Sequence, residues 1–204
     1  MQPFDNFESK FIPFPFANVD TDQIIPKQFL KLTQKTGFGK YLFNDWRYDK
    51  DGKAKEDFVL NKLKYLDRSI LLTLDNFGSG SSREHAVWAL SDYGFKAIIS
   101  SSFADIFYSN CIKNGILPIV LSKEEIDYLF KNEDLSLKIN LDTQDVVLLE
   151  HNNPITFKFQ IDSSKKKMLM EGVDEIGLTL QLDASITEYE KTKFSFLPYI
   201  KSLN

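Results

Sequence analysis

The pattern of apolar and polar positions predicts alternating strands and helices through the middle of the chain. The apolar run Ser69–Leu74 is typical of a buried strand. Residues 84–93 repeat their apolar side chains at helical spacing, and Gly94 fits the position just after a helix C-terminus. A second apolar run at 96–100 predicts another strand. Because a helical crossover connects the two strands, we expect them to pair in parallel.

The alternation continues toward the C-terminus with a helix over 104–114, a strand over 116–121 and a helix over 124–131. Ser122 and Glu125 have the spacing of a capping box, which predicts the start of that second helix. Three β-like segments and a last short helix follow at 136–141, 146–149, 155–161 and 165–171. We expect this last helix to close the ordered part. The pattern predicts a mixed α/β fold with a single domain over 1–204.

Two segments depart from this pattern. Residues 31–57 are rich in turn formers and aromatic side chains, and we interpret them as a long inserted loop. Long loops of this kind are often functional or disordered. We interpret residues 185–204 as a C-terminal tail.

Composition and charge narrow the classes of function. A chain of 204 residues with 43% hydrophobic content is long enough to bury a core. The formal net charge of -4 argues against a nucleic-acid or anionic-membrane surface, because such partners require a basic face. The first residues lack the basic and apolar regions of a signal peptide, and we expect no membrane span. The single cysteine permits no internal disulfide, so we expect a cytoplasmic protein.

The glycine-serine turn DNFGSGSSREHA at 75–86 is the strongest candidate for a ligand site. Unpaired N–H groups at a helix start favour a carboxylate or a phosphate. A Walker loop needs a lysine where Ser81 stands, a dinucleotide fingerprint needs a small residue where Arg83 stands, and the stretch lacks the G-x-S-x-G frame of serine hydrolases. Two interpretations remain: an anion pocket in which Arg83 grips a carboxylate, or a plain turn whose serines cap the helix.

The turn at 78–86 closely resembles the signature of the swivelling domain of the aconitase family. Blocks at 18–30, 102–111 and 171–180 agree with the same family in order and spacing. Within it, the segments at 37–39 and 42–48 are similar to the small subunits of bacterial 3-isopropylmalate dehydratases. The resemblance implies a β/β/α swivelling fold. It also implies a step of leucine biosynthesis, in which 2-isopropylmalate is isomerised to 3-isopropylmalate through isopropylmaleate by dehydration and rehydration.

The resemblance also implies a partner subunit and specific roles for residues of this chain. The family's four-iron four-sulfur cluster needs several thiolates, which the single Cys111 cannot supply, so we expect it in a large subunit and no metal in this chain. Ser81 occupies the position of the family's catalytic base. The substrate dicarboxylate is expected to contact four residues of the turn: Ser79, Gly80, Ser82 and Arg83.

The resemblance further implies that the inserted loop faces the variable group of the substrate. Its expected specificity residues are Phe29, Leu30, Phe38, Trp46 and Arg47. A second substrate-binding arginine of the aconitase swivelling domain has no counterpart here, because residues 11–17 read FIPFPFA. We expect Arg47 or the partner to supply that charge.

Two alternatives from other classes stay open on the sequence alone. The chain is also compatible with the small subunit of a related hydro-lyase acting on homoaconitate or a methylated maleate, and with a non-catalytic binding module. The alternating Asn18, Asp20 and Asp22 do not complete a calcium loop, so we expect them to shape the turn that leads to the site. His85 is expected to be a hydrogen-bonded structural residue, and His151 to lie on the surface.

Overall fold

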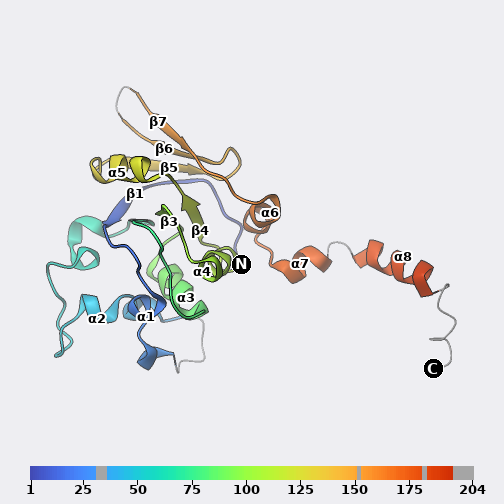
Figure 1. Ribbon diagram of the computed structural model, residues 1–204, viewed down its shortest axis with the longest axis horizontal. Coiled ribbons are helices and arrows are strands. Elements are labelled where there is room, and N and C mark those ends of the chain that lie inside the picture. The colour runs from blue at the N-terminus through green and yellow to red at the C-terminus, as the bar shows by residue number, and fades with distance from the viewer. Residues whose placement is uncertain (31–35, 151–152, 181–182, 195–204) are drawn as a thin grey trace.

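The computed structural model describes residues 1–30, 36–150, 153–180 and 183–194 (Figure 1). Its centre is a mixed sheet of seven strands in the order β4-β3-β2-β1-β5-β6-β7. The strands are β1 (Phe7–Phe14), β2 (Ile70–Thr73), β3 (Ala97–Ser100), β4 (Leu117–Val120), β5 (Ser136–Asn140), β6 (Asp145–Leu148) and β7 (Ile155–Lys158). The mixed α/β fold expected from the sequence is confirmed.

Strand β1 joins a parallel half of the sheet to an antiparallel half. Its second half pairs in parallel with β2, where Phe11 is opposite Ile70. Its first half pairs in antiparallel with β5, where Phe7 is opposite Ile139. The sequence pattern did not predict this strand. Its first half alternates, its second half is continuously buried, and Pro13 within it is unusual for a strand between two others.

Both faces of the parallel half are covered, which explains its continuous apolar runs. Along β2, Leu71 belongs to one core cluster, whereas Ile70 and Leu72 belong to the other. Helix α3 (Glu84–Tyr93) packs its buried side chains into the first cluster. Helices α5 (Lys123–Phe130) and α6 (Ser163–Glu171) pack theirs into the second. Helix α4 (Asp105–Lys113) contributes Cys111 to the first and Ile112 to the second.

Several local predictions are confirmed residue by residue. Helix α3 ends at Gly94, which adopts a left-handed φ of 114°. The strands β2 and β3 pair in parallel. Ser122 and Glu125 form the capping box at the start of α5. Within the described residues, no helix is long and apolar enough to cross a membrane.

The segment 36–57 is better ordered than an inserted loop. It contains the short helices η2 (Gly39–Tyr41) and α2 (Asn44–Arg47), and Phe38 and Phe43 are fully buried in the core. Gly39 allows this packing, because a Cβ there would lie 2.8 Å from the backbone of Asp92. Residues 31–35 of the expected loop lie outside the described part of the chain.

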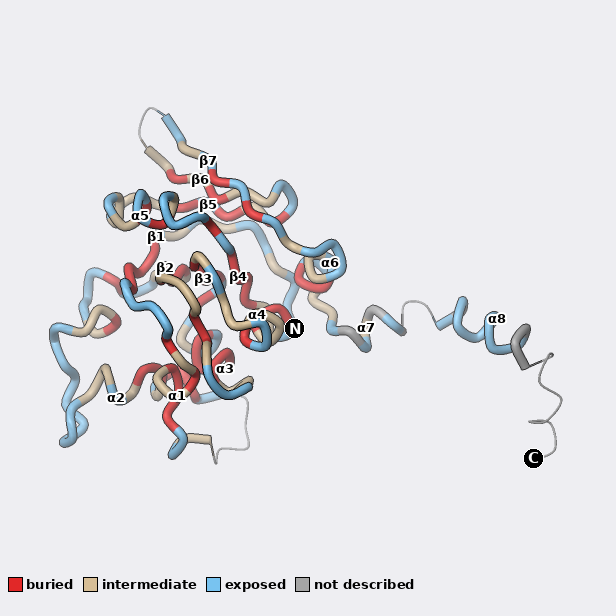
Figure 2. The backbone as a smooth tube through the Cα atoms, viewed as in Figure 1, coloured by how far each residue is buried: buried red, intermediate tan, exposed pale blue. Residues whose placement is uncertain are grey.

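The expectation that a helix at 165–171 closes the ordered part is wrong. Two more helices follow, α7 (Glu175–Leu180) and α8 (Asp183–Phe194). They lie away from the sheet (Figure 1), and Figure 2 shows much of their length as exposed. Of the expected tail 185–204, residues 185–194 belong to α8, and the remainder lies outside the described residues.

Candidate functional site

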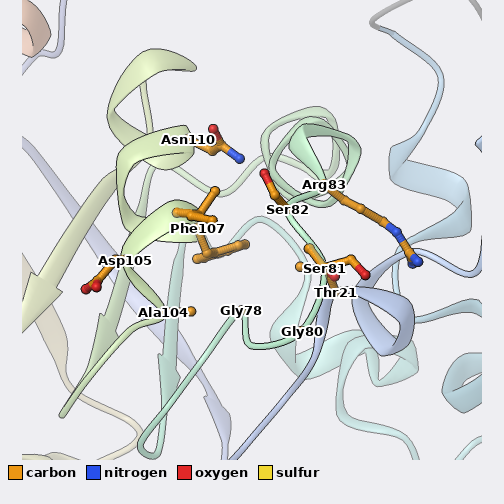
Figure 3. A pocket seen from close by; sticks show the side chains of 11 residues that line it. Thr21, Gly78, Gly80, Ser81, Ser82, Arg83, Ala104, Asp105, Phe107 and Asn110 are labelled. Atoms are coloured by element: carbon orange, nitrogen blue, oxygen red, sulfur yellow. Dashed lines mark hydrogen bonds between the residues drawn. The ribbon is translucent and has the colours of Figure 1, made fainter.

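The glycine-serine turn and the start of α4 enclose a pocket of about 220 Å³ (Figure 3). The turn leaves the C-terminal end of β2 and enters α3, so the pocket lies at the carboxyl edge of the parallel strands. Ligands of open α/β sheets commonly bind at this edge. The pocket is lined by Thr21, Gly78, Gly80, Ser81, Ser82, Arg83, Ala104, Asp105, Ile106, Phe107 and Asn110.

Two glycines let the turn approach its neighbours closely. Gly78 has a φ of 78°, and a Cβ there would lie 2.0 Å from the Phe107 ring. Gly80 has a φ of 86°, and a Cβ there would lie 3.3 Å from the Asp20 Cβ. Both positions need a left-handed backbone conformation, and at Gly78 the Phe107 ring also leaves no room for a Cβ. The glycines therefore fix the position of the turn between α4 and the segment 18–22.

The segment 18–22 clamps the turn through backbone groups. The amide of Thr21 donates to the Ser79 carbonyl at 2.9 Å, and the Thr21 hydroxyl donates to the Ser81 carbonyl at 2.8 Å. The amides of Gly78 and Ser79 donate to the Val19 carbonyl at 2.8 and 3.1 Å. Ser79 is thus engaged by its backbone and does not line the pocket. Thr21 was not among the residues expected at the site, although the family-like block at 18–30 contains it.

The expected structural role of Asn18 and Asp20 is confirmed. Asp20 caps helix α1 (Thr21–Ile24) and forms a capping box with Gln23. The side-chain oxygen of Asn18 accepts a hydrogen bond from the side-chain amide of Asn76 at 2.8 Å. These contacts order the chain that clamps the turn.

The two serines do not cap helix α3. Arg83 occupies the N-cap position, and it makes no side-chain cap. Ser81 and Ser82 are exposed, and their hydroxyls have no hydrogen-bond partner among the described residues. The amides of residues 80–85 likewise find no acceptor within the described residues. The capping interpretation is therefore wrong for these serines, and the helix start offers unpaired donors to an anion.

Arg83 reaches from the start of α3 to α1 rather than across the pocket (Figure 3). Its Nη1 forms an ion pair with Oδ1 of Asp22. This hydrogen bond to Arg83 holds the pKa of the Asp22 carboxyl below its ordinary value. Lys27 lies 3.8 Å from the other carboxylate oxygen. Asp22 therefore holds one edge of the guanidinium and fixes its orientation.

The wall opposite the serines comes from α4. Asn110 extends toward Ser82 in Figure 3, and its side-chain amide has no hydrogen-bond partner among the described residues. Ile106 is 55% exposed and lines the pocket, although it is a large apolar residue. The pocket thus combines a donor-rich side with an apolar side.

The structure contradicts the expected role of Phe38, and it places two other expected specificity residues, Trp46 and Arg47, outside the lining of the pocket. The side chain of Phe38 is fully buried and packs against His85 and Trp88, so it cannot face a ligand. Trp46 packs against Phe14 in the same core cluster. Arg47 donates from Nε to Asn61 at 3.0 Å and lines a different hollow.

Phe29 and Leu30 remain partly exposed. The Phe29 ring stacks on Tyr41 with 4.0 Å between centroids. Both residues precede the segment 31–35, which lies outside the described residues. Neither lines the pocket as described, so their contact with substrate stays a prediction.

The remaining candidates have core or packing roles. Cys111 is fully buried, and burial raises the pKa of its thiol well above the ordinary value. The His85 side chain packs against Phe38 and Trp88 and forms no hydrogen bond to a described residue. His151 lies outside the described residues. In the described part of the chain, no three His, Cys, Asp or Glu side chains gather as metal ligands.

Comparisons with known proteins give the family. Residues 1–124 match the family described as the aconitase C-terminal domain. The chain is 51% identical to the 3-isopropylmalate dehydratase small subunit of Ruthia magnifica, covering 96% of this chain and 98% of that one. It is 46% identical to the small subunit of the same name from Ruegeria sp. TM1040, covering 98% and 100%.

A solved structure agrees with these relatives. The crystal structure of 3-isopropylmalate dehydratase from Methanocaldococcus jannaschii superposes with a TM-score of 0.65 and 27% identity, covering 92% of this chain and 99% of that chain. Sequence and fold thus agree over nearly the whole length. The chain belongs to the aconitase C-terminal domain family and, within it, to the 3-isopropylmalate dehydratase small subunits.

Proposed function

We propose that the chain acts as the small subunit of a cytoplasmic 3-isopropylmalate dehydratase, in leucine biosynthesis. In this reaction 2-isopropylmalate loses water to give isopropylmaleate, and water adds back with the positions of hydrogen and hydroxyl exchanged. The observation that carries the proposal is the turn itself. Ser81 and Ser82 expose their hydroxyls beside amides that find no acceptor among the described residues, in a chain about half identical to proteins of that name.

Ser81 is the proposed base. Its alkoxide takes the proton from the carbon next to a substrate carboxylate, and returns a proton to the neighbouring carbon when water adds back. An alkoxide is costly in water. The unpaired amides of residues 80–85 and the positive end of α3 lower that cost, because they place donors beside the developing charge.

Ser82 and Arg83 are the proposed carboxylate ligands. Asp22 occupies one nitrogen of the Arg83 guanidinium, and the remaining N–H groups of its fork are left for a substrate carboxylate. The helix start adds backbone donors to the same region. A dicarboxylate is therefore a better fit to this side of the pocket than a neutral ligand.

The apolar side of the pocket is the proposed contact for the isopropyl group. Ile106 and Ala104 line it. Ile106 is largely exposed, and a bound alkyl group would bury part of its apolar surface, which favours binding. We propose that Phe29 and Leu30 complete this contact from the other side of the site. This division of polar and apolar surface favours isopropylmalate over a substrate with a third carboxylate.

Departure of hydroxide calls for a Lewis acid. The described residues hold no cluster of metal ligands, and the single cysteine is buried in the core. We propose that a large subunit holds a four-iron four-sulfur cluster and that the two chains form the site together. The term small subunit in the names of the relatives supports such a partner.

The test replaces Ser81 by alanine in the assembled enzyme. We expect Ser81→Ala to lose nearly all turnover while the two subunits still associate, because no described residue forms a hydrogen bond with this hydroxyl. The matched control is Ser91→Ala, an exposed serine at the other end of the same helix, which should retain wild-type turnover. If Ser81→Ala keeps turnover within about tenfold of wild type, the base lies elsewhere.

A further inference from the structure

A second hollow of about 460 Å³ lies at the opposite end of the parallel strands. Ser69 immediately precedes β2 and Lys96 immediately precedes β3, and both line it. The glycine-serine turn instead follows the C-terminal end of β2. The hollow is therefore separated from the first pocket by the length of the strands, and its volume is in the range of about 300–1,000 Å³ that small-molecule sites occupy.

The lining of this hollow is basic although the chain as a whole is acidic. Arg47, Arg68 and Lys96 line it, against Asp67 as its one carboxylate. Within the described residues, none of the three cations forms an ion pair. Glu133 is nearby, but Lys64 pairs with it at 2.5 Å. The lining residues thus carry three positive charges and one negative charge, an excess that attracts anions.

Two of these cations are held in place by neutral groups. Arg47 donates to Asn61 at 3.0 Å and lies over the Tyr93 ring, and its Nη1 is buried without a hydrogen-bond acceptor among the described residues. Arg68 donates to the Phe11 carbonyl at 2.6 Å. Neither contact neutralises the charge. The cations are thus pre-organised and uncompensated, which strengthens their field at the hollow.

The rest of the lining is apolar or aromatic. The Tyr65 ring lies 4.6 Å from the Arg68 guanidinium, and Leu60 and Leu66 lie beside it in the lining. Leu66 is 54% exposed, so its side chain is accessible to a ligand. A ligand that suits this surface carries both charge and an apolar body.

We propose that this hollow binds a small organic dianion, such as a phosphate monoester or a dicarboxylate, that has an apolar portion. The dianionic group faces Arg68 and Lys96, and the apolar portion lies against Tyr65 and Leu66. The inference does not depend on the proposed isomerase activity, because it uses a different set of residues.

The test is a titration of the isotopically labelled full-length chain, followed through its amide NMR signals. The probes are phenyl phosphate and phenylsuccinate, with phenol as the neutral control. We expect saturable shifts at Ser69, Gly94 and Lys96 with one or both dianions, and none with phenol. The dianion that binds with the higher affinity shows whether the hollow prefers a phosphate group or a dicarboxylate.

A variant pair locates the binding. Lys96→Gln should weaken the binding of the dianion at least about fivefold, because it removes an exposed charge whose only described contact is the Phe7 ring. Lys123→Gln, an exposed lysine on α5, should leave the affinity unchanged. The proposal is overturned by shifts confined to residues 78–84, by equal affinity of Lys96→Gln and wild type, by equal binding of phenol, or by no saturable shift.

Discussion

At Arg83 a single side chain serves both the fold and the proposed site. Its guanidinium is held by Asp22, whereas the sequence motif suggested only a grip on substrate. The motif identified the residue type and its place at a helix start, because local spacing determines both. It could not identify Asp22 as the partner, because the two are brought together by the clamp between residues 18–22 and the turn.

Replacing Arg83 by lysine keeps the charge but removes the fork. We expect a loss of about 1.5–3 kcal/mol in transition-state binding, which is the range for a lost charge-assisted hydrogen bond. The measurement is kcat/KM of the assembled enzyme for 2-isopropylmalate. Lys27→Gln is the control, since Lys27 is exposed and lies near Asp22 without lining the pocket. Unchanged values of kcat and KM for Arg83→Lys would show that Arg83 does not contact substrate.

The Asp22 carboxyl predicts how the stability of the folded chain changes as the pH is lowered. Its pKa is lowered in the folded chain, first by the hydrogen bond from Arg83, so its contribution to stability is present above the ordinary pKa of about 3.9. That contribution is lost as the pH falls through the lowered value. Since the side chain is 40% exposed, we expect at most about 1 kcal/mol.

Urea unfolding of wild type and Asp22→Asn, from neutral pH down through the lowered pKa of Asp22, measures this contribution to stability. The difference in unfolding free energy should be largest near neutral pH and should shrink toward zero in acid. A difference that stays constant down to the lowest pH would mean that the ion pair does not form in solution.

Among the elements, the turn at 75–83 and the segment at 18–22 act as one unit, because backbone and hydroxyl hydrogen bonds join them.

Helix α3, its end at Gly94 and the capping box of α5 were predictable, because residues close in sequence determine them. Strand β1 was not, because its neighbours β2 and β5 come from distant parts of the chain. The burial of Phe38 was missed for the same reason, since packing on α3 decides it.

The clamp predicts a positioning role for Thr21. Its hydroxyl donates to the Ser81 carbonyl and is removed in Thr21→Val, which keeps the side-chain shape. We expect kcat to fall by about tenfold to a hundredfold, because small displacements of a reacting group are costly, with a loss of about 1 kcal/mol in unfolding free energy.

Thr21→Ser tests whether the Thr21 hydroxyl positions Ser81 or only supports the packing of the fold. Thr21→Ser restores the donor and should recover most of kcat, while KM changes little in either variant. If Thr21→Val lowers stability but leaves kcat intact, the hydrogen bond supports the fold without positioning Ser81.

For the whole molecule, the sheet explains how the chain presents the proposed site at its surface. The parallel strands bring the turn and the start of α4 to one edge, where the pocket opens to the surface. The family resemblance predicted this fold and the location of the serines. The hollow at the other end of the strands has no counterpart in the motifs, because Arg47, Arg68 and Lys96 are gathered only by folding.

We propose that catalysis requires this chain together with a cluster-bearing large subunit. The most direct measurement is an anaerobic titration of the purified chain into the large subunit, following isopropylmaleate by its ultraviolet absorbance. We predict that the chain alone gives no turnover, and that activity rises with added chain until the two subunits are near equal amounts. Turnover by the chain alone, or activity of the large subunit that is unaffected by adding the chain, would show that the active site is not shared between the two subunits.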